Sequence, residues 1–145
     1  MNISIEKAVQ LLNEGQPVAF PTETVYGLGA DAWNADAIKK VFEIKNRPAD
    51  NPLIVHVGSR KMVDAFAAEI PNTAQQLMEN CWPGPLTLIL NKKTEVLDLV
   101  TAGLDTVALR WPSHALAQEL IDRAGPWRHR VPISLADPVP RMQNM

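Results

Sequence analysis

The sequence has a single cysteine, Cys81, and almost equal numbers of acidic and basic side chains. One cysteine excludes an internal disulfide and a zinc site built from several thiolates, and it fits a reducing compartment. The formal net charge of -2 provides no overall positive field for nucleic acid, so such binding would need a local basic patch. No charged-then-apolar leader opens the chain, and no apolar run approaches the ~18 residues of a membrane-spanning helix. We therefore expect a soluble cytoplasmic protein without a membrane partner.

The composition is that of an ordinary globular domain. Apolar residues make up 46% and charged residues 21% of the 145 residues, which allows a buried core in a chain of single-domain length. Helical and strand patterns interleave without repeats or low-complexity linkers. This arrangement favours one α/β domain.

Capping residues and apolar periodicity predict the elements of that domain. Four candidate N-caps each precede an apolar stripe at helical spacing, and Pro71 can begin a further helix; the caps are Ser4, Asn34, Ser59 and Ser113. Short apolar runs predict strands at residues 18–20, 53–57, 86–90 and 106–111. Cys81 is expected to be a small buried residue beside Trp82.

A polar segment follows the first predicted strand. Residues 21–32 (PTETVYGLGADA) carry hydroxyls, carboxyl groups, a phenol and two glycines without helical or strand periodicity. Open α/β sheets bind ligands at the carboxyl ends of their strands, so this expected loop is a candidate binding segment. The alternative is a connector whose glycines only permit turns.

A second segment, residues 44–57, combines two cations with an apolar run. Lys45 and Arg47 alternate as on an extended segment, so both can face one anion, and Pro48 prevents a preceding helix from continuing. Ammonium and guanidinium groups suit phosphate or carboxylate. The alternative is a pair of solvated surface residues.

Two polar side chains interrupt the predicted strands. His56 lies inside the apolar run 53–57, where a histidine is usually a core residue with satisfied hydrogen bonds. Arg110 comes near the end of the run 106–111, where a charge is costly unless it is paired. Its partner would be a protein carboxylate such as Asp105 or Asp122, or a bound anion.

Two further motifs complete a pattern of four segments, namely residues 82–90 (WPGPLTLIL) and 106–112 (TVALRWP). In this order and at these separations, the four segments resemble those of the threonylcarbamoyl-AMP synthase (YrdC-like) family, over roughly residues 1–126. The resemblance implies an α/β fold with a twisted mixed sheet, flanking helices and a concave ligand-binding face. It implies a nucleotidyltransferase that joins L-threonine, bicarbonate and ATP into threonylcarbamoyl-AMP and releases pyrophosphate, for t6A modification of transfer RNA.

The same resemblance implies roles for individual residues. By matching positions, Lys45 and Arg47 serve catalysis and the ATP phosphates, Asn51 and Thr106 bind ATP, and Thr24, His56 and Arg110 bind L-threonine. Tyr26 could complete that pocket, although tight packing explains it equally well. Magnesium would arrive with the ATP substrate, not in a protein cage, and the other two histidines lack ligand spacing. Transfer RNA or tRNA-modification proteins are the implied macromolecular partners.

The resemblance stops after Pro126. The family continues with a Pro-Ser-x-Asn element beside the nucleotide, whereas residues 127–145 contain three prolines and little periodicity. The codons of these residues permit the missing motif in one constant shifted frame, so we hypothesise a single-base frame change near codon 126. We expect residues 1–126 to form an incomplete YrdC-like domain and residues 127–145 to lie irregularly on its surface.

Synthase activity is therefore expected to be impaired in this chain. Two other functions remain open from the sequence, a folded inactive fragment and a module that binds double-stranded RNA or tRNA. The second would draw its charge from a local group of basic residues: Lys39, Lys40, Lys45, Arg47, Arg60 and Lys61.

Overall fold

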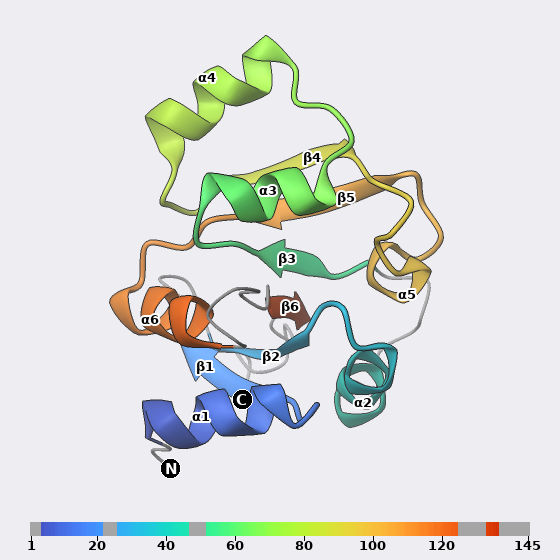
Figure 1. Ribbon diagram of the computed structural model, residues 1–145, viewed down its shortest axis with the longest axis vertical. Helices are drawn as coiled ribbons and strands as arrows, with labels where there is room; N and C mark the ends of the chain where they lie inside the picture. Colours follow the sequence, from blue (N-terminus) through green and yellow to red (C-terminus); the bar gives the residue numbers. More distant parts are fainter. Residues whose placement is uncertain (1–3, 22–25, 47–51, 125–132, 137–145) are drawn as a thin grey trace.

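The computed structural model describes residues 4–21, 26–46, 52–124 and 133–136 (Figure 1). Its helices are α1 (Ile5–Asn13), α2 (Ala35–Lys45), α3 (Arg60–Phe66), α4 (Asn72–Cys81), α5 (Asp98–Thr101) and α6 (Ala115–Arg123). Its strands are β1 (Val18–Pro21), β2 (Tyr26–Asp31), β3 (Ile54–His56), β4 (Thr87–Asn91), β5 (Thr106–Arg110) and β6 (Ile133–Ala136). In these ranges, no helix is both long and apolar enough to cross a lipid bilayer.

The six strands form one mixed sheet in the order β1-β2-β6-β3-β5-β4. Figure 1 shows β4 and β5 near the top of the view and β1 near the bottom, with α1 and α6 together at the β1 end. β3 and β5 are parallel neighbours, and the other pairs are antiparallel. The expected mixed sheet with flanking helices is therefore confirmed, and it brings the carboxyl ends of β3 and β5 together.

Local capping explains where four of the helices begin. The side chains of Ser4, Asn34 and Ser59 each accept a hydrogen bond from the amide three residues ahead, at 3.2, 3.1 and 3.3 Å, as predicted. The fourth cap is His114, whose Nδ1 accepts from the amide two residues ahead at 3.1 Å. The prediction of Ser113 as this cap is wrong by one residue.

The expectation of a loop over residues 21–32 is wrong for its second half, which forms β2. In the register with β1, Gly27 lies opposite Phe20 and Gly29 lies opposite Val18. The strand therefore alternates glycine with apolar residues, and glycine supplies no side chain to a hydrophobic pattern. Large side chains on one strand facing glycines on its neighbour are a recognised way to pack such a strand.

The expectation that residues 127–145 lie on the surface is contradicted at residues 133–136. These residues form β6, which pairs antiparallel with both β2 and β3 in the middle of the sheet. Without them, the facing edges of β2 and β3 would present unpaired amides and carbonyls, which is unfavourable in a covered sheet. Four residues of the segment therefore complete the sheet, and the rest of it lies outside the described residues.

Cys81 is exposed, contrary to the expectation of a buried thiol. The buried stripe of α4 contains Ala74 and Met78, and the next residue at this four-residue spacing is Trp82, which is buried. Helical periodicity thus turns Cys81 away from the core.

Candidate functional site

The carboxyl ends of β3 and β5 bring His56 and Arg110 side by side. These residues are direct partners in the parallel register, and the backbone amide of Val57 donates to the Arg110 carbonyl at 2.9 Å. On the other side of β5, Thr87 is the partner of Arg110. Paired residues on strands about 4.8 Å apart project to the same face of a sheet. His56, Arg110 and Thr87 therefore share one face.

This face is accessible around the pair but closed at the pair itself. Ile89 and Ala108 share the face by strand alternation, and Ile89 is 68% exposed. Leu109, which points to the opposite face, is fully buried. His56 and Arg110 are nevertheless only 1% and 8% exposed to solvent. Other segments thus cover the carboxyl ends of β3 and β5, where parallel sheets commonly bind ligands.

His56 presents a buried hydrogen-bond acceptor. Its Nδ1 lies 3.2 Å from the carbonyl oxygen of Ile54, and a carbonyl can only accept, so Nδ1 carries the proton. The Nε2 atom is then a lone-pair acceptor, and it has no hydrogen-bond partner among the residues that the structure describes. Burial lowers the pKa of His56 to about 4, although the bond to Ile54 opposes this shift. A neutral imidazole at this position can accept a bond from an N–H or O–H group of a ligand.

The lowered pKa of His56 predicts a loss of stability in mild acid. The unfolded chain takes up a proton near pH 6.5, whereas the fold holds His56 neutral down to about pH 4. The unfolded state binds more protons in this window, so this stability is complete above pH 6.5 and is lost as the pH falls towards 4, by up to about 3 kcal/mol. Urea titrations at several pH values measure the effect.

Asp31 opposes this trend, because burial raises the pKa of its carboxyl group and its protonation therefore favours the fold in acid. Comparison with His56→Leu isolates the histidine. An identical pH profile for both proteins would contradict the assignment of the acid sensitivity to His56.

Arg110 is held by the corner between α4 and β4. Its Nε donates to the carbonyl oxygen of Gly84 at 3.2 Å, and the amide of Gly84 donates to the Trp111 carbonyl at 2.8 Å. Burial lowers the pKa of the guanidinium, but an arginine stays charged at neutral pH. The bond from Nε restricts the orientation of the guanidinium, whose fork suits a carboxylate that binds through both oxygens.

The predicted ATP residues that the structure describes, Thr106 and Lys45, lie away from the carboxyl ends of β3 and β5. Thr106 is at the opposite end of β5, so it shares the face of Arg110 at a distance of ~13 Å along the strand. Lys45 is the last residue of α2, and Asn46 after it is left-handed at φ 51° and ψ 43°. Lys45 therefore lies at the carboxyl end of the helix that Pro48 was expected to stop, and the expectation that Lys45 is on an extended segment is wrong. Four predicted positions cannot be located in this way: Thr24, Arg47 and Asn51 lie outside the described residues, as does the side chain of Tyr26.

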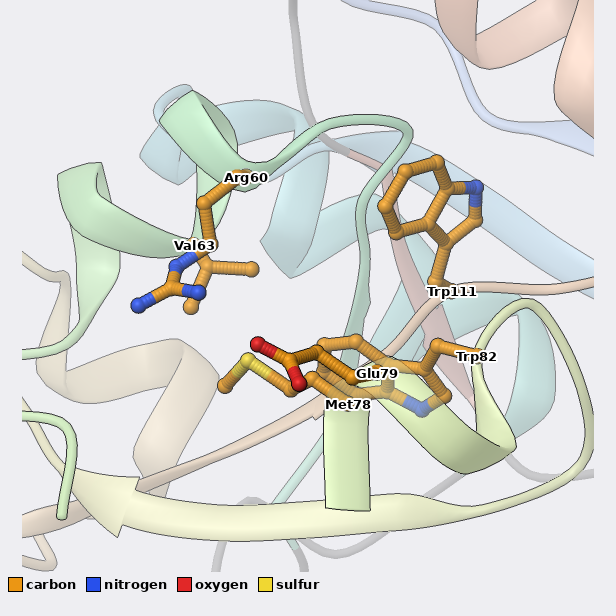
Figure 2. Close-up of a pocket in the computed structure, with 6 residues that line it drawn as sticks. All are labelled: Arg60, Val63, Met78, Glu79, Trp82 and Trp111. Atoms are coloured by element: carbon orange, nitrogen blue, oxygen red, sulfur yellow. The ribbon is translucent and has the colours of Figure 1, made fainter. Parts of the chain in front are cut away.

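A cavity of about 250 Å³ lies between α3, α4 and Trp111, the residue that follows β5 (Figure 2). Its lining is mostly apolar and includes two indoles; the residues are Arg60, Val63, Met78, Glu79, Trp82 and Trp111. Figure 2 shows the indole of Trp111 on the other side of the cavity from Trp82 and Met78. Sequence reasoning did not foresee this cavity, because its residues come from three separate segments.

Within the described ranges, no group of three or more histidine, cysteine, aspartate or glutamate side chains is arranged to hold a metal ion. The basic residues named for RNA binding are divided between elements, with Lys39 and Lys40 on α2 and Arg60 and Lys61 on α3. Of the three buried polar side chains in the described part of the chain, two are His56 and Arg110, and the third is Thr101.

Comparison with known proteins identifies the family. The Sua5/YciO/YrdC family model, described as telomere recombination, matches residues 10–133. The threonylcarbamoyl-AMP synthase of Pyrococcus abyssi is 52% identical over 118 residues, which are 81% of this chain and 35% of that protein. The Bacillus subtilis synthase is 53% identical over 122 residues, which are 83% of this chain and 35% of that protein. This chain thus spans about a third of the length of these relatives.

The structural match is equally close. The crystal structure of P. abyssi Sua5 complexed with L-threonine superposes with a TM-score of 0.86 and 47% sequence identity, covering 94% of this chain and 39% of that one. The family model covers most of the chain, and the sheet with its flanking helices agrees with a solved member. The chain therefore belongs to the Sua5/YciO/YrdC family.

Proposed function

We propose that this chain binds L-threonine and carries the threonine half of a threonylcarbamoyl-AMP synthase site. The observation that carries the proposal is the buried pair at the carboxyl ends of β3 and β5. A charged Arg110 lies beside a neutral His56 whose Nε2 has no hydrogen-bond partner among the described residues. A buried cation and a buried acceptor together complement a carboxylate and an amino or hydroxyl group. The L-threonine complex of the P. abyssi relative supports the same choice of ligand.

In this assignment, Arg110 binds the threonine carboxylate and His56 accepts a bond from its ammonium or hydroxyl group. A histidine with a pKa of about 4 is a weak base at neutral pH. Its role is therefore to orient the amino acid, not to remove a proton. Covering the site also limits water, which would hydrolyse a threonine carbamate before it reaches the nucleotide.

The nucleotide half completes the proposed reaction. The threonine amine condenses with bicarbonate, forming an N–C bond and releasing water, to give a carbamate. A carbamate oxygen then attacks the α-phosphorus of ATP, and the bond to pyrophosphate breaks as pyrophosphate leaves. We assign the phosphates to Lys45 and Arg47, with Asn51 and Thr106 as further nucleotide contacts and Thr24 and Tyr26 in the threonine pocket. Magnesium enters as part of the ATP substrate. The product supplies t6A modification of transfer RNA in the cytoplasm.

Thermal melting tests the proposal with L-threonine, with ATP and magnesium, and with both. A ligand that binds only the folded state raises the melting temperature with its concentration, so we expect a shift with L-threonine and a larger one with both. L-2-Aminobutyrate is the matched control, since it keeps the carboxylate, the amine and the γ-methyl group and lacks only the hydroxyl. No shift in a protein that melts cooperatively would contradict the proposed function.

Turnover is a separate expectation. Residues 127–145 do not contain the Pro-Ser-x-Asn element of the family, so we expect pyrophosphate release far slower than that of the B. subtilis synthase assayed in parallel. Threonine-dependent turnover equal to that of the relative would show that this element is dispensable.

A further inference from the structure

We propose that the corner formed by residues 82–86 (WPGPL) positions Arg110, and that Trp82 acts through this corner although it does not touch L-threonine. The inference deepens the proposed function and rests on it. The corner joins α4 to β4 and meets the end of β5.

The indole of Trp82 closes the corner. Its Nε1 donates to the Leu86 carbonyl at 2.7 Å, four residues ahead, and its side chain is only 9% exposed. The backbone amide of Trp82 donates to the Met78 carbonyl at 3.1 Å and so ties the corner to the last turn of α4. Both ends of the corner are thus fixed by one residue.

Gly84, at the tip of the corner, holds the end of β5 with both of its backbone polar groups. Its amide donates to the Trp111 carbonyl, and its carbonyl accepts from the Arg110 Nε. A Cβ at this position would lie 2.5 Å from the backbone oxygen of Cys81. Only glycine therefore allows the corner to return this close to α4, and the position of the Gly84 carbonyl depends on the closure made by Trp82.

The position of this carbonyl contributes to the orientation of the guanidinium through the bond from Nε. A bidentate pair with a carboxylate tolerates an error of only about 10–20°, so a loosened corner should weaken carboxylate binding without removing the positive charge. Trp82 itself lines the cavity between α3 and α4 (Figure 2), and its N–H donates to Leu86, so its effect on Arg110 passes through the corner. It is therefore a positioning residue, and Gly84 is the link.

The test compares Trp82→Phe with Trp33→Phe in the full 145-residue chain. Phenylalanine at position 82 keeps an aromatic ring and removes the N–H donor. Trp33 is the matched control because its ring stacks on Phe66 at 4.5 Å, outside the corner. Calorimetry gives the dissociation constant for L-threonine, and NMR gives the hydrogen-exchange rate of the Arg110 Nε–H in the unliganded protein.

We expect Trp82→Phe to weaken L-threonine binding about fivefold, the usual effect of one lost hydrogen bond, and to speed exchange of the Arg110 Nε–H. Trp33→Phe should change neither quantity. In an Arg110→Lys background, which lacks the guanidinium fork, Trp82→Phe should have less than about a twofold effect, because coupled residues are not additive.

Equal threonine affinity and equal Nε–H exchange in Trp82→Phe and wild type would overturn the positioning role while leaving the proposed function intact. A folded wild type that binds no L-threonine would overturn the proposed function and this inference with it. If Trp82→Phe does not fold, benzothienylalanine at position 82 keeps the shape of the indole and removes only the donor. The same outcomes then apply to that protein.

Discussion

Replacing Arg110 with alanine is expected to weaken L-threonine binding by at least about 30-fold. Removing one member of a buried charge pair costs about 2–5 kcal/mol, and each 1.4 kcal/mol is a factor of ten in affinity. Arg110 is 8% exposed and its Nε is fixed on the Gly84 carbonyl, so water cannot easily take the place of the guanidinium. Calorimetric titration with L-threonine measures the change.

Two further variants show whether the effect belongs to the guanidinium. Arg110→Lys keeps the charge and loses the planar fork, so its affinity should lie between those of wild type and Arg110→Ala. Arg123 is the matched control because it forms exposed ion pairs with Glu6 and Glu119 and is not among the residues assigned to a ligand. If Arg110→Ala and Arg123→Ala bind L-threonine equally well, Arg110 does not hold the carboxylate.

Replacing His56 with leucine should separate binding from stability. We expect L-threonine affinity to fall at least about tenfold, since the Nε2 acceptor disappears. The free energy of unfolding at pH 7 should rise by about 1 kcal/mol, because a buried acceptor without a partner among the described residues is replaced by an apolar group. The difference in free energy of unfolding between His56→Leu and wild type should grow towards pH 5, because wild type loses there the stability that its neutral imidazole contributes.

Urea denaturation at pH 7 and pH 5 measures the stability change. His114→Asn is the control, since asparagine can also cap α6 and His114 lies outside the β3–β5 pair. This variant should bind L-threonine as wild type does. A His56→Leu protein that loses stability at both pH values would mean that the imidazole is a structural residue of the core.

The sequence was sufficient to predict the β3–β5 core and its two polar residues. Both strands are apolar runs, and His56 and Arg110 are conspicuous exceptions in them. Their adjacency could not be predicted, because register depends on pairing between segments 54 residues apart in sequence. The hydrogen bond of Arg110 to the Gly84 carbonyl could not be predicted either, because every residue has a backbone oxygen and this one is 26 residues away in sequence.

β2 and β6 escaped prediction for different physical reasons. In β2, Gly27 and Gly29 occupy positions where a strand pattern would show apolar side chains. The sequence therefore lacks the alternation that indicates a strand, although β2 pairs regularly with β1. β6 is four residues long and owes its conformation to ladders with β2 and β3, which is tertiary context and not local propensity. The conformation of Lys45 was predicted wrongly, because α2 ends at this residue and so includes the first residue of the segment interpreted as extended.

Calorimetric titration of the wild-type chain with L-threonine and with L-threoninamide tests the central claim most directly. The amide keeps the amine and hydroxyl groups and lacks the negative charge that Arg110 would bind. The His56–Arg110 site predicts saturable one-to-one binding of L-threonine and at least about tenfold weaker binding of the amide. Equal affinity for both compounds, or no binding of L-threonine by the folded protein, would contradict it.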